Sequence, residues 1–238
     1  MIALCGQGDG CAGVLDTLSA IGAKYQVYTH AGERGEQMVV RAAAHGMPAT
    51  YRSINDLAAW QWSVKPNLIV SVGYLTLVSA ETLAWTPGIN CHYALLPRHR
   101  GRSSVPWAIV EGDALTGITW HWIAPKVDRG DVLMQMACPI APDETQASLF
   151  VRLHRLAVAT AGPAIRLARL GWAGVPQQGQ ASYHAAGPPH GGEIDPAWPH
   201  EYTERFIRAM TYPPLPYASY GGQEIRTMAD YHRARSDA

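Results

Sequence analysis

The segment Leu68-Ile69-Val70-Ser71-Val72 constrains the fold of this chain more than any other stretch. It is a nearly continuous run of apolar, mostly β-branched residues, which is typical of a strand buried on both faces. Such strands belong to parallel sheets that helices cover on both sides. Residues 1–5 are another short apolar run, residues 25–28 are expected to form a further strand, and a helical pattern follows each of them. The alternation predicts an α/β fold with a Rossmann-like, doubly wound and mostly parallel sheet.

A glycine-rich turn, Gly6-Gln7-Gly8-Asp9-Gly10, joins the first expected strand to the first expected helix. It is similar to the G-x-G-x-x-G motif that binds dinucleotides, but Cys11 stands where the third glycine would be. Gly13 does not restore the spacing. The sequence therefore favours a tight strand-to-helix turn over an NAD site.

Apolar spacing predicts the remaining elements of the sheet and its helices. Helices are expected over residues 36–45 and from a cap at Asn55 or Asp56 through Ala58, Ala59 and Trp62. Further helices are expected from a cap at Ser103 or Ser104 through Trp107 to Val110, and from Asp143 or Thr145 to about Leu170. Strands are expected over residues 116–123 and 132–140.

The composition changes after the long helix. Residues 173–198 are rich in Gly, Pro, Gln and His, which indicates a boundary. We expect a main domain over residues 1–175 and a small C-terminal appendage over residues 176–238. The appendage is predicted to hold one helix at 200–210 and a β-hairpin at 217–228 that turns at Gly221-Gly222.

Charge and hydropathy exclude several classes of function. Lys plus Arg and Asp plus Glu number 19 each, so the chain lacks the basic excess of proteins that bind nucleic acids through phosphates. We find no signal-peptide pattern and no apolar run near the roughly 20 residues that a membrane span needs. We expect a cytoplasmic protein with neither nucleic acid nor membrane as partner.

The cysteines and histidines are dispersed. The 4 cysteines form no C-x-x-C pair, and the 10 histidines form no H-E-x-x-H or similar spacing. We therefore expect no disulfide framework and no metal, as in a reducing compartment.

Three polar residues are candidates for chemistry. Asn90 and His92 are two positions apart at the end of an expected strand, so they share a face. Asp128 lies in a loop that follows the next strand. An amide can donate to a developing oxyanion, an imidazole can move a proton, and a carboxylate can fix its tautomer. This set suits acyl transfer to an amine, although Asn-x-His is also common in capped turns.

The segments that carry these residues resemble the catalytic core of the 10-formyltetrahydrofolate-dependent formyltransferases. The similar stretches are residues 90–101 (N-C-H-Y-A-L-L-P-R-H-R-G), W-A-I-V-E-G-D, T-G-I-T and V-D-R-G-D-V-L, in that order. The resemblance runs from about residue 66 to 155 and extends more weakly over the N-terminal half. It departs at Ala94, where the family carries Ser, outside the three candidate residues.

The resemblance implies transfer of a formyl group from N10-formyltetrahydrofolate to a primary amine. Residues 1–175 would then be the catalytic domain. Asn90 would stabilise the oxyanion, His92 would move the proton of the amine, and Asp128 would hold and polarise His92. By the same analogy, the cofactor would contact Tyr74, Leu75, Leu77, Pro125 and Val127.

The tail is similar to one branch of the family. Residues 192–198 and 207–213 resemble the segment that follows the core in methionyl-tRNA and nucleotide-sugar formyltransferases and that glycinamide ribonucleotide formyltransferases lack. A methionyl-tRNA enzyme would carry a further β-barrel and a basic surface, whereas this sequence ends at Ala238 with no net charge. The favoured acceptor is a dTDP- or GDP-linked amino sugar.

A pyrophosphate linker requires a few well-placed cations. The candidates for acceptor binding are Arg98, Arg100, Arg102, Arg205, Arg208 and the aromatic ring of Tyr212. Each arginine could equally be an ordinary solvated charge. We expect a homodimer. The alternatives are an amino acid or peptide amine as acceptor, a formyltetrahydrofolate hydrolase, and a silent binding module, against which the intact candidate trio argues.

Overall fold

A computed structural model describes residues 1–56, 65–213 and 215–236 of the chain. The chain divides into two compact units, and each unit is built from three segments. The first unit consists of Met1–His92, Ile118–Met136 and His154–Gln178, and the second of Tyr93–Gly117, Ala137–Leu153 and Gly179–Ala238. The domain boundary expected near residue 175 stays a prediction.

A seven-stranded sheet, in the order β3-β2-β1-β4-β5-β7-β8, is the centre of the fold. Its strands are β1 (Ile2–Gly6), β2 (Tyr25–Tyr28), β3 (Ala49–Thr50), β4 (Leu68–Val72), β5 (Gly88–His92), β7 (Leu115–Trp122) and β8 (Val132–Pro139). Strands β3, β2, β1, β4 and β5 pair in parallel, and β7 pairs antiparallel to β5. The predicted Rossmann-like, mostly parallel α/β sheet is confirmed.

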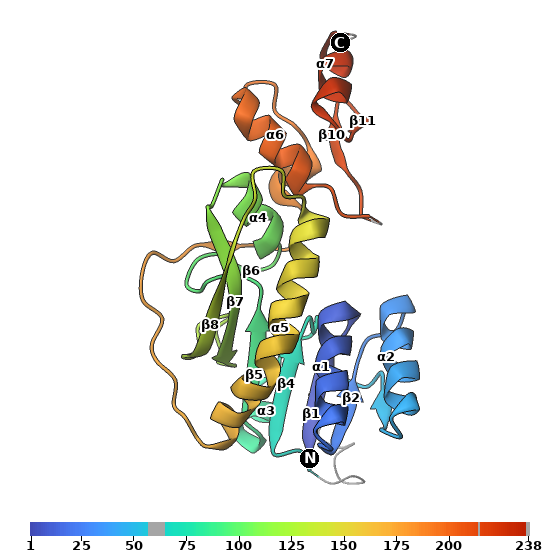
Figure 1. The fold of residues 1–238 in the computed structure, drawn as a ribbon, viewed down its shortest axis with the longest axis vertical. Coiled ribbons are helices and arrows are strands. Elements are labelled where there is room, and N and C mark those ends of the chain that lie inside the picture. The colour runs from blue at the N-terminus through green and yellow to red at the C-terminus, as the bar shows by residue number, and fades with distance from the viewer. Residues whose placement is uncertain (57–64, 214, 237–238) are drawn as a thin grey trace. The chain divides into compact units, whose positions relative to one another are not determined.

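The strands at the centre of this sheet are buried on both faces. All five residues of β4 and all five of β1 are buried, as their continuous apolar runs predict. The helices associated with the sheet are α1 (Gly8–Ala20), α2 (Glu33–Ala44), α3 (Ala80–Trp85) and α5 (Gln146–Arg169). Helix α1 buries Val14, Leu15 and Leu18, and it lies beside α2 along β1 and β2 (Figure 1).

Most helices predicted for this part of the chain are confirmed. The structure differs from the prediction in where α1 begins and in two short elements. Helix α1 begins at Gly8, so most of the glycine-rich turn forms its first residues. The short elements β3 and α3 were not expected; α3 is too short to show a period, although Ser79 caps it through the backbone N–H of Thr82. The helix expected through Ala58, Ala59 and Trp62 lies outside the described residues.

The order of the strands sets where ligands can bind. Strand β1 pairs with β2 on one side and with β4 on the other, so the direction of winding reverses between β1 and β4. In such sheets ligands bind beyond the carboxyl ends of the strands near this reversal. Asn90 and His92 lie at the carboxyl end of β5, next to β4.

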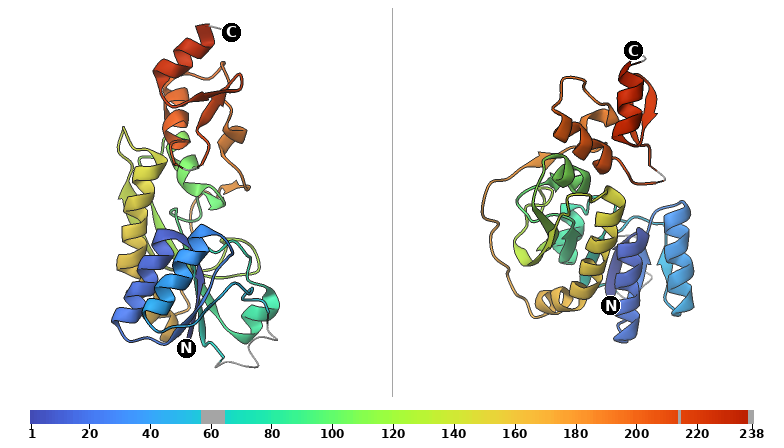
Figure 2. Two further views of the ribbon diagram at one scale, coloured as in Figure 1. Left: turned by 90° about the vertical axis from the view of Figure 1, so that its right-hand side faces the viewer. Right: turned by 45° about the horizontal axis from the view of Figure 1, so that its top comes forward.

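The second unit contains short elements. They are β6 (Arg100–Gly101), α4 (Ser104–Val110), β9 (Tyr183–His184), the 3-10 helix Pro189–Gly192, α6 (His200–Ala209), β10 (Ala218–Tyr220), β11 (Gln223–Ile225) and α7 (Met228–Ser236). Strands β10 and β11 form the predicted hairpin, and α7 packs beside it and beside α6 (Figure 2). The predicted helix at 200–210 is confirmed.

Helix α7 was not predicted from the sequence. Only Tyr231 and Ala234 of its residues are buried, so it has almost no apolar period. A different signal marks its start: the Thr227 hydroxyl accepts from the backbone N–H of Asp230, and the Asp230 carboxylate accepts from the backbone N–H of Thr227. This reciprocal capping arises from the spacing T-x-x-D, which was readable in the sequence.

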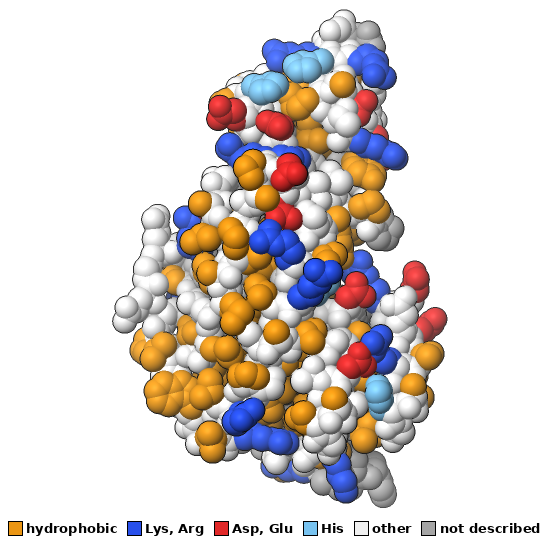
Figure 3. Space-filling view, viewed as in Figure 1, with side chains coloured by type: hydrophobic (Ala, Val, Ile, Leu, Met, Phe, Trp, Pro, Cys, Tyr) orange, Lys and Arg blue, Asp and Glu red, His pale blue; other side chains and the backbone are white. Residues whose placement is uncertain are grey.

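The described part of the chain contains no helix that is long and apolar enough to cross a membrane. On the face seen in Figure 3, basic and acidic side chains are interspersed among the described residues. All four cysteines are buried and have free thiols, and they pack as small apolar side chains do. Burial raises the pKa of the Cys91 thiol well above its ordinary value, so Cys91 is a packing residue of β5 and stays protonated.

Candidate active site

The pairing of β5 with β7 brings a further polar residue, His121, next to the predicted pair Asn90 and His92. In the antiparallel register of β5 and β7, Asn90 lies opposite His121, and His92 lies opposite Thr119. Side chains of directly opposed residues project from the same face of a sheet. Asn90, His92 and His121 therefore face the same volume at the carboxyl end of β5.

Asp128 joins these residues from the loop between β7 and β8. One carboxylate oxygen, Oδ2, lies 3.5 Å from Nδ1 of His92, and the other, Oδ1, lies 3.4 Å from Nε2 of His121. The side chains are 8%, 2% and 9% exposed for His92, His121 and Asp128, respectively. The carboxylate therefore lies between two imidazoles in a setting where water screens charge weakly. The predicted neighbours His92 and Asp128 are brought together.

The hydrogen bonds of His121 fix the orientation of Asn90. Nδ1 of His121 lies 2.8 Å from the carbonyl oxygen of Trp122, and a carbonyl oxygen only accepts, so Nδ1 carries the ring proton. In the neutral ring, Nε2 then accepts from Nδ2 of Asn90, which is 3.2 Å away. This contact uses one of the two N–H groups of the amide, and the second can donate elsewhere.

The loop that carries Asp128 has a constrained backbone. Asp128 has a φ of 52°, in the left-handed region. A Cβ on Gly130 would lie 1.7 Å from the carbonyl oxygen of Trp122, so only glycine permits this approach of the loop to β7. The side-chain amide of Gln177 donates to the carbonyl oxygens of Asp128 (2.8 Å) and Gly130 (2.9 Å). Gln177 thus holds the loop on both sides of the turn.

We expect Gln177→Ala to lower kcat on the order of tenfold while changing the donor KM less, because small displacements of a catalytic group have large kinetic costs. Its loss leaves two backbone carbonyls without their amide donor and loosens the placement of Asp128. The matched control is Gln178→Ala, which changes an exposed neighbour of the same type. Steady-state rates of the two variants that coincide would contradict a positioning role for Gln177.

The predicted cofactor contacts divide into anchored and exposed residues. The Tyr74 hydroxyl accepts from the backbone N–H of Ile54 at 3.1 Å, and the ring packs 4.6 Å from that of His30. Leu75 and Leu77 are 50% and 70% exposed. In the other loop, Pro125 is exposed and Val127 is half-buried. Tyr74 therefore fixes the loop after β4, and the two leucines present apolar surface.

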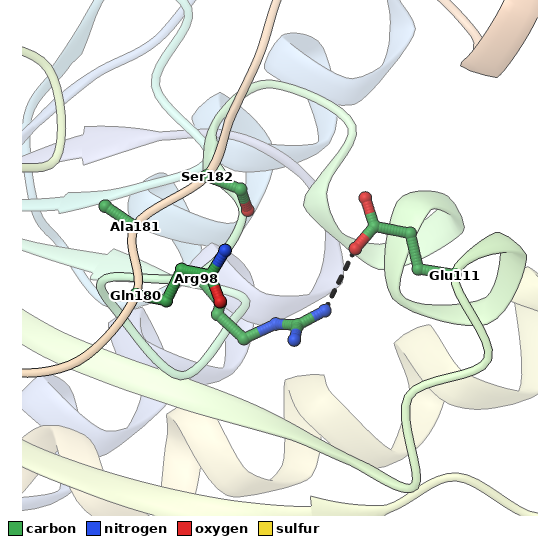
Figure 4. A pocket seen from close by; sticks show the side chains of 5 residues that line it. All are labelled: Arg98, Glu111, Gln180, Ala181 and Ser182. Carbon is green, nitrogen blue, oxygen red and sulfur yellow. Dashed lines mark hydrogen bonds and ion pairs between the residues drawn. The ribbon is translucent and has the colours of Figure 1, made fainter.

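The predicted acceptor-binding residues belong to the second unit. Arg98 donates to Glu111 at 2.9 Å and to Asp113 at 2.6 Å, and Figure 4 shows its guanidinium directed at Glu111 in a small pocket of about 100 Å³. Arg100 lies in β6, and Arg102 is exposed just after it.

Arg208 and Tyr212 lie near the end of α6. Arg208 donates from Nη1 to the carbonyl oxygen of Glu144 at 2.9 Å, whereas its buried Nε has no hydrogen-bond partner among the described residues. Together with Arg205, it lines an open cavity of about 190 Å³. The Tyr212 ring packs 4.9 Å from that of Phe150. Among the predicted acceptor-binding residues, Arg205 and Arg208 at this cavity are the best placed to bind an anion.

The sequence interpretation missed His121 and Gln177. A signal for His121 was present, since the alternating segment 116–123 predicts a strand whose odd-numbered positions share a face. The signal lacked the register that sets His121 opposite Asn90, which is a property of the paired strands. Gln177 lies in the segment taken as a boundary, and its two contacts are with backbone atoms 49 and 47 positions away.

The arrangement of Asn90, His92 and Asp128 suits proton transfer together with stabilisation of an oxyanion. A partly exposed amide with a spare N–H group stands beside an imidazole and a buried carboxylate. Such a group of residues can stabilise an oxyanion and carry a proton between two heteroatoms without a covalent enzyme intermediate.

Comparison with known proteins shows what the chain as a whole is similar to. The family described as "Formyl transferase" matches residues 15–162. A GDP-perosamine N-formyltransferase of Brucella melitensis biotype 1 is 37% identical over 155 residues, which are 64% of this chain and 60% of that protein. A methionyl-tRNA formyltransferase of Akkermansia muciniphila is 35% identical over 167 residues, which are 68% of this chain and 53% of that protein. The matches thus span about half to three-fifths of these relatives' length.

The fold also matches solved structures. An N-formyltransferase from Helicobacter canadensis, solved in complex with folinic acid and dTDP-3-aminofucose, superposes with a TM-score of 0.79. The match covers 94% of this chain and 86% of that one, at 16% sequence identity. At this identity the likeness establishes the shared fold.

Proposed function

Because this chain belongs to the formyl transferase family, we propose that it transfers the formyl group of N10-formyltetrahydrofolate to the primary amine of a nucleotide-linked amino sugar, with a dTDP or GDP carrier. The observation that carries the proposal is the cluster of Asn90, His92 and Asp128 within the region that matches the family. A GDP-perosamine N-formyltransferase among the relatives supports the acceptor class.

In the proposed reaction, a new C–N bond forms between the amine and the formyl carbon, and the bond from that carbon to N10 breaks. The spare N–H of Asn90 donates to the formyl oxygen as it gains negative charge. His92 takes the proton that the attacking amine loses and delivers it to the departing nitrogen. Asp128 stabilises the imidazolium of His92 between these two transfers.

The residues at the carboxyl end of β4 fit a flat heteroaromatic donor such as the pterin. The exposed side chains of Leu75 and Leu77 offer apolar contact next to the strand that pairs with β5. Tyr74 holds their loop to the core, because its hydroxyl accepts from the backbone of Ile54 and its ring packs on the core cluster below β4. Pro125 and Val127 border the candidate site from the Asp128 loop. N10-formyltetrahydrofolate bound here would supply the formyl group.

The decisive experiment measures acceptor-dependent release of tetrahydrofolate. The protein is incubated with N10-formyltetrahydrofolate alone, with dTDP-linked and GDP-linked amino sugars, and with amino acids or a peptide as competing amines. Turnover only with amino sugars supports the proposal. Release without an acceptor would indicate a hydrolase, turnover with amino acids or a peptide would redirect the acceptor, and no turnover with any amine would leave a binding module.

Arg208 is the acceptor-binding candidate that the structure makes most specific. Its Nε is buried without a described partner, and Arg205 lies at the same cavity. A phosphate oxygen would satisfy this donor. Arg98, Arg100, Arg102 and Tyr212 remain candidates of the same proposal.

We expect Arg208→Ala to raise the KM for the sugar nucleotide roughly tenfold or more and to change kcat less, because a charge-assisted hydrogen bond is lost. Arg208→Lys should recover part of the affinity by keeping the charge. Arg166→Ala is the control, since it removes an exposed guanidinium from α5 that does not line the cavity. An unchanged KM in a folded Arg208→Ala protein would exclude this arginine from acceptor binding.

We further propose that the protein is a cytoplasmic homodimer that binds neither nucleic acid nor membrane. The zero net charge and the interspersed charges on the face in Figure 3 support the second point. Light scattering on the eluting protein would measure the oligomeric state, and a monomer mass would contradict the dimer.

A further inference from the structure

Two histidines and a glutamate from three separate stretches of the sequence meet in the second unit. His99 precedes β6, His184 ends β9, and Glu111 follows α4. One potential ligand atom from each lies within 4.8 Å of the others. We propose that these three side chains bind a divalent transition-metal ion, for which Zn²⁺ is the best fit. The three proposed ligands are not among the residues proposed for formyl transfer, and the two sites share only Arg98, which contacts Glu111.

The tautomer of His99 suits metal binding. Its Nε2 lies 2.7 Å from Oδ2 of Asp113, and a carboxylate only accepts, so the ring proton is on Nε2. Nδ1, which therefore carries the lone pair, lies 2.9 Å from Nε2 of His184. A carboxylate that accepts from the far nitrogen of a ligating histidine is the common second layer of zinc sites, because it orients the ring and makes it more basic.

Glu111 is positioned by the same arginine that holds Asp113. Arg98 donates to Oε2 of Glu111 at 2.9 Å (Figure 4). It also donates to Oδ1 of Asp113 at 2.6 Å. The other oxygen of Glu111, Oε1, lies 3.8 Å from Nε2 of His184. One oxygen of each carboxylate thus binds the arginine, and the second faces a histidine. With neutral rings, the group of Arg98, Glu111 and Asp113 keeps one net negative charge for a cation.

The His184 ring is held at one face and at one edge. It stacks on the ring of Trp107 at 4.5 Å, and it meets the ring of His99 edge to edge, with the centroids 5.1 Å and the two nitrogens 2.9 Å apart. Strand β9 pairs with β6, and a Cβ on Gly101 would lie 2.2 Å from the carbonyl oxygen of His184, so glycine permits this approach.

Two imidazole nitrogens and one carboxylate oxygen are one of the ligand sets found in zinc sites with three protein ligands. In such sites water takes the fourth position. This set could not be recognised from local spacing, because His99 and His184 are 85 positions apart. The competing interpretation is a proton shared between the two histidines, in which Nε2–H of His184 donates to Nδ1 of His99. The shared proton fits the 2.9 Å between the two nitrogens as it stands, whereas a tetrahedral ion would move them to about 3.3 Å apart, so metal binding itself separates the two interpretations.

The ion would cross-link β9, through His184, to the turn that contains His99. That segment contacts the turn through the β6–β9 pair and through the Ser182 hydroxyl, which accepts from the backbone N–H of His99 at 2.8 Å. Binding to the folded state alone stabilises it in proportion to the logarithm of the ion concentration over Kd. We therefore expect Zn²⁺ at about 100 times its Kd to raise Tm by about 5–10 °C.

The test uses the full chain without an affinity tag, stripped with a chelator. Zn²⁺ binding is measured by calorimetry, and Co²⁺ is used as a visible-absorption probe of a low-coordinate site with nitrogen ligands. One equivalent of either ion should bind and should change Trp107 fluorescence, since that ring stacks on His184. Glu111→Gln and His184→Gln should each raise Kd about 100-fold or more, and Asp113→Asn should raise it about 10–100-fold.

The exposed His200→Gln of the same unit is the control and should bind the ion like the original protein. Glu111→Gln is the variant that keeps the test valid if His184→Gln unfolds, because Glu111 is partly exposed and glutamine keeps its shape. No saturable binding, or binding that Glu111→Gln and His200→Gln leave equally strong, would overturn the proposal in favour of the shared proton.

Discussion

His92→Asn is expected to lower kcat about 10²–10⁴-fold, the usual contribution of a positioned acid–base group. Asparagine keeps a polar, planar group at the position but cannot accept and release a proton near neutral pH. The reacting amine must then lose its proton to water. Rates of tetrahydrofolate release at saturating acceptor measure the change.

This substitution should leave donor binding close to that of the original protein. His92 is only 8% exposed and lies at the end of β5, while the proposed donor contacts belong to the loops after β4 and β7. The donor Kd and Tm should therefore change little. The surface variant His45→Asn, 38% exposed, is the control for a generic histidine loss. An unfolded His92→Asn protein would instead favour a packing role, and a folded one with undiminished kcat would remove His92 from the chemistry.

The fold could be predicted from the sequence wherever one residue pattern decides the structure. Leu68–Val72 forms the strand that its apolar run predicts, and the region around Trp120 forms the strand that alternation predicts. Trp120 is fully buried, and its indole N–H donates to Thr160 of α5 at 2.9 Å. Elements with little apolar surface, such as α7, could not be predicted from period because capping and neighbouring elements stabilise them.

The candidate site was predictable in part for the same reason. The spacing of Asn90 and His92 sets their shared face within one strand, so the sequence alone contains that relation. The contacts of Asp128 depend on a left-handed turn, on Gly130 and on Gln177, which is far along the chain. His99 and His184 illustrate the limit further, because two dispersed histidines become neighbours only when β6 pairs with β9. Long-range pairing carries information that local spacing lacks.

The two histidine clusters also differ in chemistry in a way that the sequence does not show. At His92 and His121, one carboxylate lies between two rings and a partly exposed amide stands beside them, which suits the transfer of a proton. At His99 and His184, the carboxylates are held by Arg98, and Nδ1 of His99 and Nε2 of His184 lie 2.9 Å apart. The first arrangement favours turnover and the second favours a bound cation.

Asn90→Ala should lower kcat about 10²–10³-fold, as the loss of one oxyanion donor does in acyl transfer. The amide has one N–H engaged by Nε2 of His121 at 3.2 Å, which holds the amide in one orientation and leaves the second N–H to donate. That pre-set direction makes the donor effective, since no reorganisation is needed as charge develops. Alanine removes the donor and also leaves His121 without its amide partner.

The KM for the donor should change far less than kcat, because the interaction is made fully only when the formyl oxygen carries charge. Asn67→Ala, an exposed asparagine just before β4, is the matched control and should keep full activity. The variant His121→Gln separates the two contributions of Asn90. If Asn90 acts only by holding His121, the double variant will be no slower than His121→Gln alone; if its second N–H meets the oxyanion, Asn90→Ala will slow the reaction further in that background.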